Sequence, residues 1–134
     1  MIKHLAAFGG TALALVVLDA LWLTFAGPKL YRPIIGEILA DKVSFGPAIA
    51  FYVLYVFGVT VLAVRPALAS GKWTEALILG VILGVVAYGA YDLTNQATLK
   101  VWSTKITLMD LAWGAFVTAA GAVAGFFASR LVSR

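Results

Sequence analysis

Three aspartates lie inside or at the edge of segments that are apolar enough to cross a membrane: Asp19, Asp92 and Asp110. A carboxylate at the centre of a spanning helix costs roughly 2.5–3.5 kcal/mol on insertion scales, and less near a helix end, where it reaches the interface. A chain that carries three such residues has to supply hydrogen-bond partners for their carboxyl groups within a helix bundle, or it uses these groups in its function. Their positions therefore constrain both the fold and the place of a functional site.

The composition is that of an integral membrane protein. Hydrophobic residues make up 63% of the chain and charged residues 12%, whereas a soluble domain has about 45–50% apolar and about 25% charged residues. The absence of cysteine excludes disulfides and thiolate metal sites. The lysines and arginines are dispersed without a run, which is typical of membrane-interface anchors. We therefore expect the lipid bilayer as a partner and no nucleic acid.

Four apolar segments predict four transmembrane helices, at about residues 5–26, 47–64, 76–95 and 107–130. Each is close to the roughly 20 residues that cross about 30 Å of hydrocarbon. The segments are apolar on every face, which disfavours a barrel of short alternating strands. The predicted fold is an all-α membrane protein, a four-transmembrane-helix bundle, with residues 1–134 forming a single integral membrane domain.

Local signals give the expected helix ends. Pro28 is expected to end the first helix and Pro66 the second, because proline cannot continue the hydrogen-bond ladder. Thr107 is expected to start the fourth helix, which would put Asp110 in its first turn. Between residues 27 and 46, apolar residues at helical spacing alternate with charged ones, which predicts a short helix lying at the membrane interface.

Four antiparallel spans bring the polar residues to one side of the membrane. The ends of the first and third helices, which carry Asp19 and Asp92, lie beside the starts of the second and fourth helices. The pair Asp-x-x-Trp occurs twice, at Asp19/Trp22 and Asp110/Trp113. We predict one common binding site formed by acidic, amide and aromatic side chains, namely Asp19, Trp22, Tyr52, Tyr55, Tyr88, Tyr91, Asp92, Asn95, Asp110 and Trp113.

Matching glycine stripes predict close packing of the third and fourth helices. Gly80 and Gly84 form a GxxxG motif on the helix face that continues to Asp92. Gly114 lies one turn after Asp110 on the fourth helix. We expect the two glycine faces to meet and to bring the two carboxyl groups together.

Each of these features also has a simpler explanation. Asp110 can be read as favourable charge at a helix N-terminus, and Asp92 as part of a helix-end turn. The tryptophans and tyrosines suit an interfacial aromatic belt, and the GxxxG motif suits plain packing. Asp19 has the weakest such alternative, because it is at no cap position and no Lys or Arg lies within the spans to pair with it.

Several motifs resemble one known family. The stretch YDLTNQATL at residues 91–99, Trp102, and DLAWG at residues 110–114 resemble the predicted bacterial membrane proteins grouped as DUF2177. The segment DALWL at residues 19–23 and the tyrosines of the second span fit the same pattern. The resemblance covers nearly the whole chain and implies a multi-pass protein of the bacterial inner (cytoplasmic) membrane. It implies no activity, because the function of the family is unknown.

The residue types limit the chemistry. The interior of the predicted spans lacks Lys, Arg, His, Cys and Glu, which excludes a Schiff-base lysine, a haem ligand pair and a Ser–His triad. Carboxyl groups can bind a hard cation, hold a proton, or pair with an amine caged by aromatic rings. We assign no metal ligand, and the cofactor is unknown.

Two function classes stay open. The first is binding, or proton- or cation-coupled transport, of a small solute, with Asp19 as the central acid. The second is a membrane enzyme, or an accessory subunit of a membrane complex, that acts on a lipid-soluble substrate. Five basic residues lie on each side of the membrane, so charge does not decide orientation. That balance also permits a homodimer, including an antiparallel one, or a larger complex.

Overall fold

The computed structural model describes all 134 residues and is helical without strands. The elements in chain order are α1 (Ile2–Ala26), the π-turn η1 (Gly27–Tyr31), α2 (Arg32–Ile35), the 3₁₀ turn η2 (Gly36–Ile38), α3 (Phe45–Val59), the π-turn η3 (Thr60–Val64), α4 (Arg65–Ser70), α5 (Trp73–Thr98) and α6 (Thr104–Leu131). Four continuous helical stretches are long and apolar enough to cross a membrane. The predicted fold class is confirmed.

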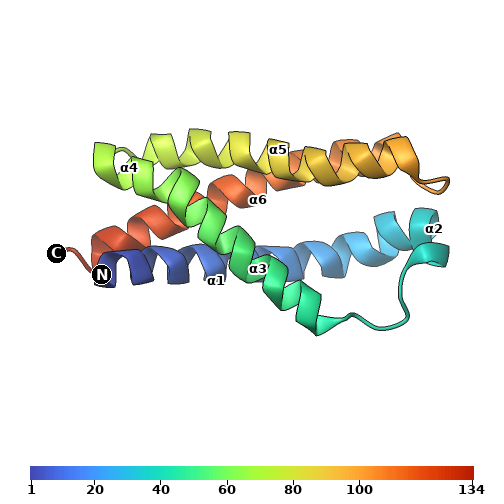
Figure 1. Cartoon of the computed structure of the whole chain (residues 1–134), viewed down its shortest axis with the longest axis horizontal. Helices are drawn as coiled ribbons and strands as arrows, with labels where there is room; N and C mark the ends of the chain where they lie inside the picture. The colour runs from blue at the N-terminus through green and yellow to red at the C-terminus, as the bar shows by residue number, and fades with distance from the viewer.

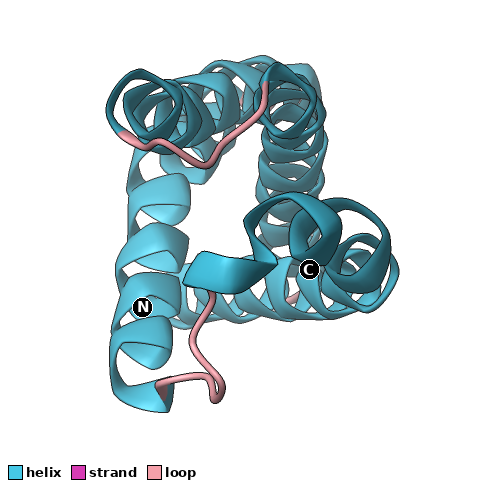
Figure 2. Cartoon of the chain, turned by 90° about the vertical axis from the view of Figure 1, so that its right-hand side faces the viewer, coloured by secondary structure: helices cyan, strands magenta, loops and turns pink.

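Helix α6 is the centre of the bundle. It packs along α1 on one side and along α5 on the other, and it contributes the largest share of buried residues. Helix α3 crosses α1 obliquely, and its first half leans away from the other helices (Figure 1). The two chain ends lie together, opposite the end that carries α2 and the connection from α5 to α6 (Figure 1). Viewed from that opposite end, the molecule consists of helices joined by short loops (Figure 2).

Glycines let the helix backbones touch. A Cβ atom added at Gly84 of α5 would lie 2.7 Å from the carbonyl carbon of Gly114 in α6. A Cβ atom added at Gly125 of α6 would lie 2.9 Å from the carbonyl oxygen of Ala7 in α1. Both distances are shorter than real side chains adopt, so only glycine permits these contacts. The predicted contact between the glycine faces of α5 and α6 is confirmed.

The helix ends predicted at the prolines are wrong. The backbone stays helical through Pro28 to Ile38, and through Pro66 to Ser70. A π-turn lies at each of these two prolines. The π-turn η1 contains Pro28, and η3 directly precedes α4, which contains Pro66. Proline removes one hydrogen bond, and the wider π-turn makes room for its ring beside the preceding carbonyls. The second stretch ends instead at Gly71, whose φ of 75° is the left-handed conformation common after a helix.

The facing ends of α5 and α6 are longer than predicted. α5 continues to Thr98, and α6 begins at Thr104 with Ser103 as its side-chain cap. Asp92 and Asp110 therefore lie about two helical turns inside their helices. The expectation that Asp110 is in the first turn is wrong, so a capping role does not account for it.

The predicted interfacial helix continues directly from α1. Its apolar residues Leu30 and Ile35 are buried against Ile106 at the start of α6. Its charged residues Lys29 and Arg32 are exposed. This amphipathic segment covers one end of the bundle, on the side where the aspartates lie.

A first prediction tests the topology. Because the chain has no cysteine, single cysteines at Gly36, Ser70 and Lys100 can be labelled without background. In intact cells, Gly36→Cys and Lys100→Cys should react with a membrane-impermeant maleimide from the same side, and Ser70→Cys from the other. Labelling of positions 36 and 70 from one side would contradict the four-span arrangement.

A second prediction tests the contact between α5 and α6. Gly84→Ala should lower the free energy of unfolding by about 1–3 kcal/mol, because overpacking forces the helices apart. Gly9→Ala in α1 is the control, since a Cβ there meets nothing within 4 Å. Thermal unfolding in detergent measures both variants. Equal midpoints for the two would show that the glycine contact does not hold the bundle together.

Candidate functional site: an acidic and aromatic cluster at one end of the bundle

Asp19 joins three helices. Its side chain points into the bundle and is 9% exposed. Oδ2 accepts a hydrogen bond of 2.7 Å from the Tyr52 hydroxyl of α3, and Oδ1 accepts one of 3.0 Å from the Trp113 indole N–H of α6. Both carboxyl oxygens thus have a donor, and the free-energy cost of placing the acid among apolar helices is reduced. Asp19, Tyr52 and Trp113, three of the residues predicted for one common site, are therefore in direct contact.

The two Asp-x-x-Trp pairs are cross-linked. The Tyr31 hydroxyl of η1 donates to Oδ1 of Asp110 and accepts a 3.0 Å hydrogen bond from the Trp22 indole N–H. The rings of Trp22 and Trp113 stack with centroids 4.7 Å apart and planes 8° from parallel. Each tryptophan is therefore linked by hydrogen bonds to the aspartate of the other pair. Trp113 donates directly to Asp19, whereas Trp22 donates to Tyr31, which donates in turn to Asp110.

Asp92 is the least satisfied acid. It is fully buried between α5 and α6, and neither of its oxygens accepts a hydrogen bond from a hydroxyl, amide or indole donor. The carboxyl group of Asp110 on α6 is the ionisable group that lies beside Asp92, across the contact between the two helices. An unpaired carboxyl group in such a place is costly and uncommon. Stability alone does not explain why the chain carries it, which makes Asp92 a functional candidate.

Asp110 lines two cavities. The first, of about 360 Å³, is the lateral cavity between α3 and α5, lined by Phe51, Tyr55, Ala87, Tyr88, Tyr91 and Asp110. The second, of about 460 Å³, is the rim cavity beneath α2, and its lining includes Tyr31, Arg32, Tyr91, Trp102 and Asp110. Only Asp110 and Tyr91 line both.

Aromatic side chains form the wall of the lateral cavity. The Tyr55 ring stacks on Phe51 at 5.3 Å and meets the Tyr88 ring edge-on at 6.5 Å. The Tyr55 hydroxyl is 2.7 Å from the Thr118 hydroxyl of α6. Tyr88 packs directly over Gly114, where a Cβ would collide with its ring. These contacts hold the rings in place, so the cavity is formed before any solute enters.

Two of the predicted residues lie differently from the others. Tyr91 is 60% exposed and lies outside the buried stripe of α5, because one residue of helix turns it about 100° away from Asp92. Its ring meets Trp102 edge-on at 5.9 Å. Asn95 is half-buried one turn beyond Asp92 and lines neither cavity.

Several polar residues near the site were not predicted from the sequence. Tyr31 gave no signal, because the segment after Pro28 was expected to be separate from the first helix. A second network connects α5 to the start of α6: the Trp102 indole donates to Thr107 at 3.0 Å, and Thr107 donates to Gln96 at 2.7 Å. Gln96 and Trp102 belong to the motif stretch after Tyr91, so the pattern contained them without revealing their role.

The cluster supplies carboxyl groups, phenols and indoles. No group of three His, Cys, Asp or Glu side chains in the 134 residues is arranged to hold a metal ion. The arrangement can bind a cation by charge and by aromatic faces, and it can hold or release a proton.

These features define a class: a multi-pass membrane protein of four helices with buried acids and aromatic rings gathered at one end. The model of the family described as a predicted membrane protein, DUF2177, matches residues 4–127, and the chain belongs to that family. The match spans every residue of the acidic and aromatic cluster. No curated protein and no solved structure matches the chain. The description of the family names no activity, so function has to be argued from the site.

A third prediction tests the hydrogen bond to Asp19. Tyr52→Phe should lower the free energy of unfolding by about 1–3 kcal/mol, because one oxygen of a buried carboxylate loses its donor. Tyr91→Phe is the matched control, since this hydroxyl-bearing ring is mostly exposed. Thermal unfolding in detergent should separate the two variants by several degrees. If Tyr52→Phe unfolds like the control, Asp19 does not depend on Tyr52.

Proposed function

We propose that the protein binds a small cationic solute at Asp110 and transports it in exchange for a proton. The observation that carries the proposal is the position of Asp110. It lines both cavities, and it faces a second buried carboxyl group, Asp92, to which no hydroxyl, amide or indole donates a hydrogen bond.

The walls of the lateral cavity support a cation as the solute. The rings of Tyr55, Tyr88 and Tyr91 surround a space that ends at Asp110. Aromatic faces attract quaternary or protonated amines, by about 0.5–2 kcal/mol for each well-placed ring. The volume of about 360 Å³ lies in the lower part of the range of small-molecule sites, roughly 300–1,000 Å³. A compact organic cation fits these properties best.

The pair of acids supports proton coupling. Two neighbouring carboxyl groups away from water favour a state in which they share one proton, because two negative charges there repel each other and are poorly solvated. A bound cation supplies positive charge in place of that proton. Cation entry would then release the proton, and proton return would release the cation.

The loose packing of α3 supports access from the membrane. Leu54 of α3 is largely exposed on the apolar surface and Phe51 is about half exposed, and the first half of the helix leans away from the bundle (Figure 1). The π-turn η3, which follows α3, would act as the hinge, because such turns interrupt the regular hydrogen-bond ladder of the helix. A movement of α3 would open or close the lateral cavity.

For Asp19 we propose a positioning role in place of the central role expected from the sequence. It lines neither cavity, and both its oxygens already accept hydrogen bonds. It holds α3 and Trp113 in place, and thereby the walls around Asp110.

We also propose the bacterial inner membrane as the location, on the resemblance of the motifs, and a homodimer as an assembly that the charge balance permits.

An enzyme that acts on a lipid-soluble substrate is the second candidate. The lateral cavity has mainly apolar walls and lies between α3 and α5, which belong to two of the stretches apolar enough to span a membrane. The Asp92–Asp110 pair would then transfer a proton to or from the bound substrate. Chemical conversion of a bound lipid, in place of reversible binding, would identify this alternative.

A fourth prediction tests the cation site. The protein in lipid nanodiscs should bind tetraethylammonium or tetraphenylphosphonium, and Asp110→Asn should weaken binding at least about tenfold, because the charge that pairs with the cation is lost. Affinity should fall as the pH is lowered, because protons compete for the same carboxyl groups. Asp41→Asn, in an exposed loop, is the control. Isothermal calorimetry at several pH values measures the affinities.

Variants of the two aspartates distinguish the role of Asp92 from that of Asp110. Asp92→Asn should keep some binding but reduce its pH dependence, since one member of the pair can no longer ionise. Wild-type affinity in Asp110→Asn, or equal losses in Asp110→Asn and Asp41→Asn, would contradict the proposal.

A further inference from the structure

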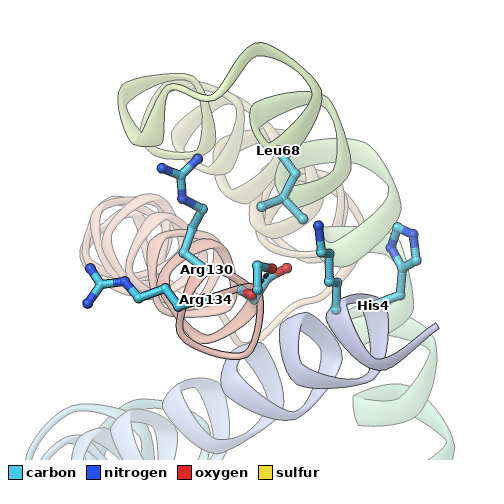
Figure 3. Close-up of a pocket in the computed structure, with 7 residues that line it drawn as sticks. His4, Leu68, Arg130 and Arg134 are labelled. Carbon is cyan, nitrogen blue, oxygen red and sulfur yellow. Dashed lines mark hydrogen bonds between the residues drawn. The ribbon is translucent and has the colours of Figure 1, made fainter.

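A separate cavity lies at the opposite end of the bundle, where the chain ends meet. It has a volume of about 440 Å³ and lies between the start of α1, α4 and the end of α6. Lys3, His4, Arg130 and Arg134 are among the residues that line it, and Leu68 of α4 supplies its one apolar residue. Figure 3 shows Arg130 reaching toward α4, His4 standing on the far side beyond Leu68, and Arg134 directed away.

The charge around this basic cavity is one-sided. Arg65 and Lys72 lie at the same end of the bundle, and Glu75 is the one acidic side chain there. Glu75 does not line the cavity and accepts a hydrogen bond from Ser70. The first turn of α1 adds backbone N–H groups without helical partners and the positive end of its dipole, and the arginines at the C-terminal end of α6 offset the negative end of the α6 dipole. An anion in the cavity would meet several positive groups and no carboxylate side chain.

A buried hydroxyl group also points to a ligand. Ser129 of α6 lines the cavity, is fully buried, and its Oγ has no hydrogen-bond partner. One turn later, the Ser133 hydroxyl donates 2.6 Å to the Ser129 carbonyl oxygen. A serine in a helix can satisfy its hydroxyl by the same bond to the carbonyl oxygen one turn earlier, which Ser133 makes from the turn that follows α6. The free hydroxyl of Ser129 is therefore a donor that lacks an acceptor at the edge of a cationic cavity.

The simpler explanation covers only part of this arrangement. Arginines near a helix C-terminus offset its negative dipole and anchor the helix at the interface. Arg130 also lies 5.9 Å from the Phe126 ring. That role explains Arg130 and Arg134, but it explains neither the unpaired Ser129 hydroxyl nor the basic residues of α1 on the same cavity.

We infer that this basic cavity binds a phosphate group, with Lys3 and Arg130 as the charged ligands and Ser129 as a neutral donor. A phosphate accepts hydrogen bonds from several directions at once, which suits an ammonium, a guanidinium and a hydroxyl on different helices. The phosphate can belong to an anionic lipid headgroup or be free inorganic phosphate. This site is at the other end of the bundle from Asp110 and does not depend on the proposed function.

A fifth prediction tests the phosphate site in two arms. In the lipid arm, nanodiscs of phosphatidylcholine alone are compared with nanodiscs that also contain phosphatidic acid. In the other arm, inorganic phosphate is titrated into protein in phosphatidylcholine nanodiscs. Thermal unfolding and native mass spectrometry of retained lipid are the measurements. We expect stabilisation in at least one arm, and the arm that responds identifies the source of the phosphate.

The variants make the test specific. Lys3→Gln with Arg130→Gln should reduce phosphate or lipid retention at least about tenfold, and Ser129→Ala should reduce it severalfold while keeping the fold. Lys42→Gln with Lys100→Gln removes the same charge from exposed sites at the opposite end and should have no effect. The inference is overturned if neither arm shows stabilisation, or if the two double variants lose retention equally. It is also overturned if Ser129→Ala retains phosphate and lipid like the unmodified protein.

Discussion

The contact between the backbones of α5 and α6 at Gly84 and Gly114 is the constraint on which the candidate site depends. It brings two helices closer than side chains would allow, and it places Asp92 against Asp110. The Tyr88 ring packs against Gly114 at the same contact. A methyl group at either glycine would separate the helices and change the acid pair and the cavity wall together.

Hydrogen bonds offset the free-energy cost of burying the three aspartates to different extents. Asp19 has two donors from two other helices, and Asp110 has Tyr31, which Trp22 supports in turn. Asp92 has none. Hydrogen bonds to the first two acids tie helices together, whereas an unpaired acid beside a paired one is a poor contributor to stability. This inequality is why we place the chemistry at Asp92 and Asp110 and a positioning role at Asp19.

The two ends of the molecule have opposite character. One gathers three carboxyl groups and aromatic rings beneath α2, and the other gathers cationic side chains around a buried hydroxyl. We propose cation binding at the first end and phosphate binding at the second. A phosphate bound at the membrane interface would hold that end of α1 and α6 in place.

The sequence by itself determined the four spans, the common side of the three aspartates and the glycine faces of α5 and α6, because length, hydropathy and helical periodicity are local properties. The helix ends needed the tertiary structure: a proline predicts a stop, but whether a π-turn accommodates it depends on what the following residues, such as Leu30 and Ile35, can pack against. The hydrogen bond from Tyr31 to Asp110 joins residues 79 positions apart, and no local pattern encodes such a pair. Likewise, the unpaired state of Asp92 and of Ser129 depends on which side chains of other helices reach them, which only the packed bundle decides.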